Sequence, residues 1–168
     1  MPTSENTKHY KPSIIALMRD LLIEKMYEIT KKPYQKFFKK GIPWKETPSD
    51  LINYQQDSLG FHLGCFLLKY NFEMQPKLED HDVIHVPTNT GVSVVDEIAM
   101  QYFLLGNGKK SAYLFMVICI GTIFYPTQIK HFIHTYNRGK KAHQFHDLDF
   151  YKMLTIPVKT IQSTFNIK

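Results

Sequence analysis

The sequence predicts an all-α fold, namely a single-domain multi-helix bundle with a buried central apolar helix. Three observations lead to this prediction. Apolar residues recur at the spacing of three and four that marks amphipathic helices, proline and glycine divide the chain into helix-sized segments, and strand-like alternation of useful length is missing. A chain of 168 residues, 43% of them hydrophobic, is long enough for one domain with a full core.

The N-terminal part predicts an amphipathic helix. Ser13 is a suitable N-cap, and the helix is expected to continue to about Lys31 before Pro33 ends it. The apolar residues at helical spacing are Ile14, Leu17, Met18, Leu21, Leu22, Met26 and Ile29. A short basic piece then covers residues 34–40.

The middle of the chain predicts further helices over residues 49–56 and 58–72. The next helix carries residues 81–85 and is expected to end near His85, because Pro87 lacks an N–H group and restricts the residue before it. Ser93, with Asp96 three residues later, can then cap a helix that reaches about Leu105.

The C-terminal third predicts the central helix and those that close the fold. Residues 111–124 are apolar on all sides, which indicates a helix buried in the middle of the bundle. Pro126 suits the first turn of another helix, which is expected to end at about Gly139. Residues 147–154 and 157–165 are expected to form two short closing helices.

Charge is distributed unevenly along the chain. Residues 1–46 contain ten Lys and Arg against five acidic residues, residues 47–129 contain four against eight, and residues 130–168 contain seven against two. Basic ends suit an anionic membrane surface and an acidic middle suits a cation, although an ordinary solvated surface explains the pattern equally well. Nucleic acid is not an expected partner, because no zinc-finger, RRM or KH signature is present.

Cysteine content and hydropathy indicate the compartment. Cys65 and Cys119 lie in apolar runs and are expected to be buried free thiols of a reducing compartment. The polar first dozen residues resemble no secretory signal, and the longest apolar stretch, residues 112–126, is shorter than the roughly 20 residues of a membrane span. A soluble or peripheral protein is therefore expected.

One run concentrates residues that can bind a metal: His81 and Asp82, then His85, then Glu97 after eleven residues. On a helix His81 and His85 share one face, whereas Asp82 lies about 100° around it. Neutral imidazole and carboxylate suit Zn²⁺, Mn²⁺ and Fe²⁺. We predict one divalent-metal site, with Zn²⁺ as the expected ion and Mg²⁺, Mn²⁺ or Fe²⁺ as alternatives. A hydrogen-bonded or exposed polar cluster is the competing interpretation.

Two hydrolase classes share part of this spacing. Zinc peptidases use H-E-x-x-H, but Asp82 is one methylene shorter than Glu, and Pro87 follows too soon for the usual long helix. HD-type phosphohydrolases would have to recruit His62 and Asp147 at poorly matching spacings. We expect neither class. The remaining histidine pairs, predicted to be polar surface residues rather than ligands, are His131 with His134 and His143 with His146.

The run resembles the signature H-D-x-x-H-x11-E of a family of ubiquinone (coenzyme Q) biosynthesis proteins, the fourth of the yeast Coq series. His81, Asp82, His85 and Glu97 stand at its four positions. Residues 57–70 resemble the family's T-L-G segment and the helix upstream of the signature, residues 136–142 its Y-x-R-G-x-x-A turn, and residues 154–167 its closing segment. The resemblance covers about residues 47–168. We therefore separate a basic helical segment, residues 1–46, from a metal-site domain, residues 47–168.

The resemblance implies a helical fold and a divalent metal held by His81, Asp82, His85 and Glu97. Asp82 would bind the metal, orient His81 or act as a base. The implied ligand is a prenylated lipid or quinone precursor, and the implied reaction removes the C1 carboxylate of its aromatic head group, with or without hydroxylation at that carbon. The alternative is a non-catalytic prenyl-lipid-binding or scaffold protein that keeps the metal site for structure.

The resemblance also implies partners and a location. It predicts a peripheral protein at the inner face of the cytoplasmic membrane, or on the matrix side in a mitochondrion. Other quinone-biosynthesis proteins and a second copy of this chain, in a homodimer, are the expected protein partners. The family often carries Arg just before the signature, where residues 75–80 of this chain hold one base and two acids. The substrate that this site would accept therefore stays open.

Overall fold

The computed structural model describes residues 21, 25, 43–74 and 79–168, and within these ranges all regular structure is helical. The helices are α2 (Pro48–Leu51), α3 (Leu59–Tyr70), α4 (Glu79–Thr88), α5 (Val94–Gly106), α6 (Ala112–Phe124), α7 (Ile129–Lys141) and α8 (Val158–Thr164), with 3₁₀ turns η1 (Pro126–Gln128) and η2 (Phe150–Met153). The predicted all-α class is confirmed. The helix predicted over residues 13–31 and the basic piece over 34–40 lie outside the described residues, apart from two positions, and the domain boundary at residue 46 stays a prediction.

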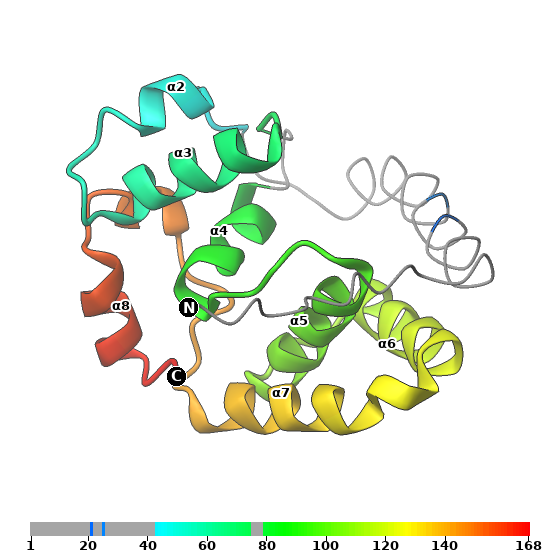
Figure 1. The fold of residues 1–168 in the computed structure, drawn as a ribbon. Coiled ribbons are helices and arrows are strands. Elements are labelled where there is room, and N and C mark those ends of the chain that lie inside the picture. The colour runs from blue at the N-terminus through cyan, green and yellow to red at the C-terminus, as the bar shows by residue number, and fades with distance from the viewer. Residues whose placement is uncertain (1–20, 22–24, 26–42, 75–78) are drawn as a thin grey trace, which may run out of the picture.

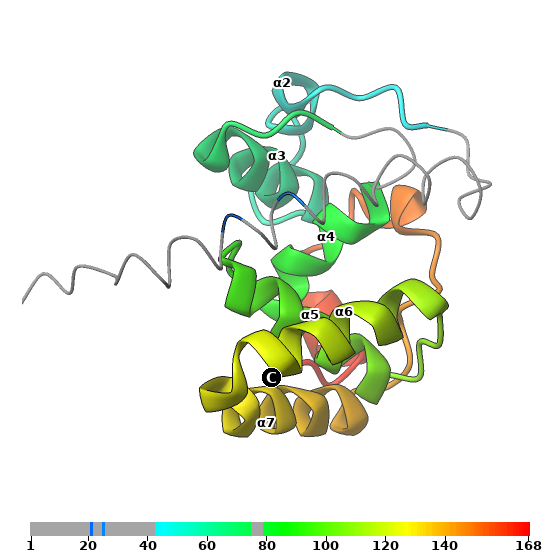
Figure 2. The same cartoon turned by 90° about the vertical axis from the view of Figure 1, so that its right-hand side faces the viewer.

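The helices are arranged around α4 and α5. Figures 1 and 2 show α2 and α3 at one end of the molecule, α7 at the other, and α4 and α5 between them. The larger hydrophobic core joins buried residues of α3, α4, α5 and the C-terminal segment, among them Leu63, Ile84 and Phe103. A smaller cluster around Phe132 lies between α5 and α7.

Most helix predictions in the middle of the chain are confirmed. Ser58, Ser93 and Ser111 each accept a hydrogen bond from the backbone N–H group three residues later, so they are the N-caps of α3, α5 and α6. The predicted capping box is also present, because the Asp96 carboxylate accepts a hydrogen bond from the backbone N–H of Ser93.

Some predicted helix bounds are wrong. The helix expected over residues 49–56 ends at Leu51, because the backbone then turns through hydrogen bonds that reach three residues back, from Asn53 and Tyr54. Of residues 147–154, only η2 is helical, and it is a 3₁₀ turn. Residues 136–142, expected to form a turn, belong to α7 up to Lys141.

The helix of the metal-binding run passes through Pro87 and ends at Thr88, instead of ending near His85 as predicted. Proline lacks an N–H group and so removes one backbone hydrogen bond from a helix. In α4 this loss falls in the last turn, where only Thr88 follows Pro87 in the helix. The Thr88 hydroxyl donates to the carbonyl of Ile84 at 2.6 Å and so supplies a side-chain bond in this last turn. Asn89 then ends the helix with a φ of 52°, a left-handed conformation that asparagine tolerates.

Helices α5 and α7 cross at very short range because glycine stands on both. A Cβ atom on Gly139 would collide with the carbonyl oxygen of Phe103, and one on Gly106 with the carbonyl oxygen of Tyr136. Asn107, directly after α5, holds the chain that follows α7. Its side chain donates to the carbonyl of His143 at 3.0 Å and accepts from the backbone N–H of Phe145 at 3.0 Å.

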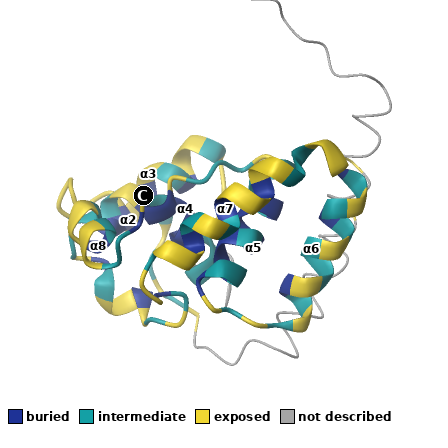
Figure 3. Ribbon diagram, turned by 90° about the horizontal axis from the view of Figure 1, so that it is seen from below, coloured by how far each residue is buried: buried dark blue, intermediate teal, exposed yellow. Residues whose placement is uncertain are grey.

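The prediction that residues 111–124 form a buried central helix is wrong in its position. Only Leu114 and Gly121 of α6 are buried, whereas Phe115 is 46% and Ile123 75% exposed. Figure 3 shows α6 at one side of the molecule, with exposed and half-buried residues along it. When a helix is apolar on all sides, its sequence does not show which side packs against the rest of the protein. The central place belongs to α5, six of whose residues are buried.

The two cysteines are free, as predicted, but both are exposed rather than buried. Cys65 lies on the outer side of α3, near the exposed Leu68, and Cys119 lies between Phe115 and Ile123 on α6. Their apolar sequence neighbours belong to helices with an exposed apolar side, so local hydropathy wrongly predicts that the two cysteines are buried.

Within the described ranges, no helix by itself has the length and hydropathy of a membrane span. One bent pair, Ala112–Phe124 with Pro126–Lys141, reaches both criteria together, with an angle of 105° between its parts.

Candidate metal centre

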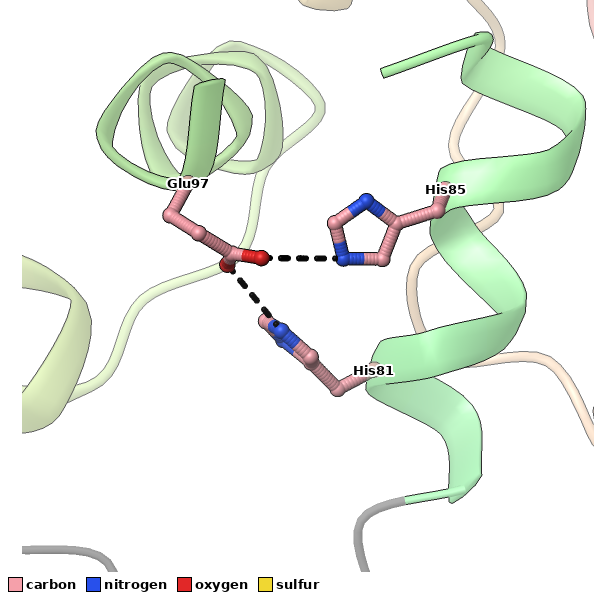
Figure 4. A group of neighbouring side chains, drawn as sticks. All are labelled: His81, His85 and Glu97. Atoms are coloured by element: carbon pink, nitrogen blue, oxygen red, sulfur yellow. Dashed lines mark ion pairs between the residues drawn. The ribbon is translucent and has the colours of Figure 1, made fainter. Parts of the chain in front are cut away.

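Two helices bring three of the four predicted ligands together. His81 and His85 project from one face of α4, and Glu97 projects toward them from the first turn of α5 (Figure 4). The Nε2 atom of His81 lies 3.2 Å from one carboxylate oxygen of Glu97, and Nε2 of His85 lies 3.2 Å from the other. The capping box at Ser93 fixes where α5 begins, and the helix dipole favours a carboxylate at this position.

His85 is held in a defined orientation. Its side chain is only 2% exposed, and its ring stacks on Phe66 of α3 with ring centroids 5.0 Å apart. Its Nδ1 atom lies 3.2 Å from the carbonyl oxygen of Thr90, to which it can donate a hydrogen bond. That bond keeps a proton on Nδ1 and leaves Nε2 facing Glu97, so Nε2 is the atom that can bind a metal once it is unprotonated.

The electrostatics of the metal-free site follow from this geometry. Burial raises the pKa of Glu97, but the charges and hydrogen bonds of His81 and His85 outweigh it and hold this pKa well below its ordinary value. Burial lowers the pKa of His85. The hydrogen bond and charge of Glu97, the Thr90 carbonyl and the charge of Asp82 together raise that pKa above its ordinary value.

The donor set fits a divalent cation. One ligand atom from each of His81, His85 and Glu97 lies within 4.8 Å of the other two. A metal with bonds of about 2.1 Å keeps its ligands at most about 4.2 Å apart, so small side-chain movements would close the site. Two imidazoles and one carboxylate are a frequent catalytic zinc set, which leaves a further coordination position for water or substrate.

The site is open on one side. His81 is 20% exposed and Glu97 34% exposed, whereas His85 forms the buried wall. A small molecule could therefore approach the group from the side of His81 and Glu97.

Asp82 lies on α4 next to His81 and is half-buried, but it does not belong to the converging group found among the described residues. Its charge adds to the effects of Glu97 and Thr90 that raise the pKa of His85, and it is the smallest of these effects. Its role as a ligand, an orienting group or a base stays a prediction.

The alternative histidines and acids lie elsewhere. His62 is exposed on α3, and Asp147 is exposed and accepts a hydrogen bond from Gln144 at 3.2 Å. Neither belongs to the converging group, so the HD-type arrangement does not form. The histidine pairs predicted to be surface residues are exposed at His131, His134 and His143, and half-buried at His146.

Two contributors to the site were not predicted. The sequence gives no signal for the carbonyl of Thr90, because every residue carries one. Phe66 lies in the helix predicted over residues 58–72, but no role in the site was predicted for it. An aromatic residue on the helix preceding an H-x-x-x-H pair is a candidate for stacking on one of those rings.

The fold resembles a solved structure. No family model and no curated protein matches the sequence. The crystal structure of a "putative ubiquinone biosynthesis protein" from Nostoc punctiforme PCC 73102 superposes on the chain with a TM-score of 0.64 and 18% sequence identity. The match covers 90% of this chain and 82% of the other. The two proteins therefore share a fold over most of their length.

Proposed function

We propose that this protein acts in ubiquinone or related quinone biosynthesis, where it uses a divalent metal, expected to be Zn²⁺, to modify a prenylated aromatic head group. The observation that carries the proposal is the convergence of His81, His85 and Glu97 from α4 and α5. The H-D-x-x-H-x11-E pattern and the fold shared with the Nostoc protein support the choice of pathway.

The proposed reaction is removal of the C1 carboxylate of the ring. A bound metal would supply a Lewis acid for a carboxylate or phenolate oxygen of the substrate. His85 is preorganised by Phe66 and Thr90, and Glu97 contributes the negative charge that retains the cation. The bond between the ring and the carboxylate breaks, CO₂ leaves, and a proton takes its place. Asp82, next to His81, is the side chain proposed to handle that proton.

The proposal includes a lipid environment. The substrate would carry a prenyl tail, and the protein would lie at the inner face of the cytoplasmic membrane, or on the matrix side in a mitochondrion. The exposed Phe115 and Ile123 of α6 and Ile133 of α7 offer apolar area for such a surface. Other quinone-biosynthesis proteins, and a second copy of this chain in a homodimer, complete the proposed partners.

The same exposed residues favour one alternative, a non-catalytic prenyl-lipid carrier or scaffold in which the metal is structural. A turnover assay separates the two functions. CO₂ release and product formation are measured on prenylated hydroxybenzoic acids with zinc-loaded protein and with His85→Ala, beside binding of the same lipids. Loss of turnover with retained lipid binding supports the enzyme. Lipid binding without turnover in either protein contradicts it and supports the carrier.

A further inference from the structure

The C-terminal end of α4 is held by side chains from two helices distant in the sequence. We propose that Arg138 of α7 and Gln162 of α8 are positioning residues, which set the orientation of the metal ligand His85 through the backbone of residues 87–90. The inference rests on the proposed metal site. Neither residue would contact the metal, but both would affect its affinity.

Both residues donate to carbonyl groups at the end of α4. Nε2 of Gln162 lies 2.9 Å from the carbonyl oxygen of Pro87, and Nη2 of Arg138 lies 3.2 Å from that of Thr88. The last carbonyl groups of a helix have no partner within the helix, so a side chain that supplies one fixes the position of this turn. The two donors approach the same turn from different elements.

Arg138 is itself fixed in place. Its Nε atom donates to the carbonyl of Lys168 at 2.7 Å, and its guanidinium carbon lies 5.8 Å from the ring centroid of Phe103 on α5. One side chain therefore joins α4, α5 and the last residue of the described chain. Arginine suits this place because its planar group presents several donors at fixed angles.

A short series of hydrogen bonds connects this turn to His85. The hydroxyl groups of Thr88 and Thr90 lie 2.8 Å apart, and the backbone N–H of Thr90 donates to the carbonyl of His85 at 3.1 Å. The carbonyl of Thr90 is in turn the partner of His85 Nδ1. A displacement at Pro87 or Thr88 therefore moves the acceptor that orients the imidazole and turns Nε2 away from Glu97.

The test compares Gln162→Glu and Arg138→Met with matched controls. Glutamate keeps the shape of Gln162 but cannot donate to Pro87, and methionine keeps the apolar stem of Arg138 without its donors. Ser163→Ala on α8 removes a hydrogen bond to Thr160 that does not reach α4, and Lys140→Met removes an exposed cation on α7. Zn²⁺ affinity is measured by competition with a chromophoric chelator, and the Co²⁺ absorption spectrum reports ligand geometry.

We expect both variants to bind Zn²⁺ roughly 10- to 100-fold more weakly and to change the Co²⁺ spectrum, as loss of groups that orient metal ligands does elsewhere. Both controls should match the unaltered protein. A lowered melting temperature with unchanged Zn²⁺ affinity and Co²⁺ spectrum would show a purely structural role and overturn the inference. Should Arg138→Met fail to fold, the conservative Gln162→Glu decides alone.

A measurement on the metal-free protein separates this inference from the proposed function. Nitrogen NMR of the neutral His85 ring, recorded at high pH, shows whether Nδ1 carries the proton that is hydrogen-bonded to Thr90. If the unaltered protein bound no metal, the proposed function would fail, yet the inference still predicts this signature in the unaltered protein and its loss in Gln162→Glu. An unchanged His85 signature in Gln162→Glu contradicts the inference whatever the metal result.

Discussion

His85 owes its orientation to groups on three sides of one ring. The Phe66 ring stacks against it, the Thr90 carbonyl faces Nδ1, and a carboxylate oxygen of Glu97 faces Nε2. In the metal-free protein this contact is an ion pair when His85 is protonated, that is, at pH values below its raised pKa. A metal would replace the proton on Nε2, so protons and metal compete for the same atom.

This competition predicts opposite pH dependences for the metal-free and metal-bound proteins. The pKa of Glu97 is lowered from 4.5, so its stabilising contribution is present above pH 4.5 and is lost as the pH falls through the folded value. The pKa of His85 is raised from 6.5, so its contribution is present below pH 6.5 and is lost as the pH rises through the folded value. The pair therefore stabilises the metal-free protein most between pH 4.5 and 6.5.

Zn²⁺ binding requires the unprotonated imidazole, so the metal should stabilise the protein more at higher pH. We expect the increase in melting temperature on adding Zn²⁺ to be larger at about pH 7.5 than at about pH 5.5. Differential scanning fluorimetry at matched ionic strength measures this increase in melting temperature. Glu97→Gln, which removes the carboxylate that pairs with His85, serves as the control. An increase that is equal at both pH values, or larger at the lower one, would contradict this account of the site.

At the residue scale, the sequence predicted the three side chains that converge, His81, His85 and Glu97, but not the groups that hold them in place. The i, i+4 spacing places His81 and His85 on one face, and the box of Ser93 and Asp96 predicts where the helix of Glu97 begins. The role of the Thr90 carbonyl cannot be predicted from the sequence, because it depends on where the chain turns after α4. Asp82 is adjacent in sequence to His81, but it lies about 100° further around the helix and does not belong to the converging group.

At the scale of the helices, the crossing of α5 and α7 brings their backbones very close together. It places α7, and with it Arg138, beside the helix that carries Glu97. Gly106 and Gly139 allow the approach, because the backbone of the opposite helix occupies the space of each missing Cβ. A side chain at either position would push α7 away from the helix that carries Glu97.

We therefore predict that Gly139→Ala destabilises the protein by at least about 1–3 kcal/mol, the usual cost of overpacking. The cost is expected at the upper end or above it, because the added methyl group would meet the backbone of α5, which cannot move aside as a side chain can. Urea denaturation of the metal-free protein measures the change in the free energy of unfolding. Lys140→Ala, one residue further along α7 and exposed, should stay within about 0.5 kcal/mol of the original. If Gly139→Ala were as stable as Lys140→Ala, the helices would not cross as described.

Helix bounds and helix burial differ in how well the sequence predicts them. The Ser93 cap predicted where α5 begins, because a cap is a local interaction, and Ser58 and Ser111 cap α3 and α6 in the same way. The passage of α4 through Pro87 was missed, since the bonds that support its last turn come from Thr88 and from α7 and α8. The exposed side of α6 was missed because uniform hydropathy does not say which face is covered.

At the scale of the molecule, the exposed apolar residues of α6 lie on one stripe. Phe115, Cys119 and Ile123 are four apart, so they share the outer face of the helix, and all three are exposed. Contiguous apolar area on a surface marks a place of interaction with a partner or a lipid. In the proposed function this stripe contacts the membrane that holds the prenylated substrate.

This assignment predicts that Ile123→Asp weakens binding to vesicles containing anionic phospholipid, measured by cosedimentation, while Zn²⁺ affinity and folding stability are unchanged. Ile123 is 75% exposed, so its replacement removes little packing. Leu68→Asp, at a position 49% exposed on α3, is the matched control and should bind vesicles normally. Equal vesicle binding by the two variants and the original would exclude the α6 stripe as the lipid contact.

The central claim is that His81, His85 and Glu97 hold a metal ion. Its most direct test is the metal content, by inductively coupled plasma mass spectrometry, of protein purified without a metal-affinity tag and reconstituted with Zn²⁺, beside His81→Ala and the exposed His131→Ala as control. The account predicts close to one ion per chain in the original and in His131→Ala, and loss of that ion in His81→Ala. No metal in the original after reconstitution, or equal metal in His81→Ala, would contradict it.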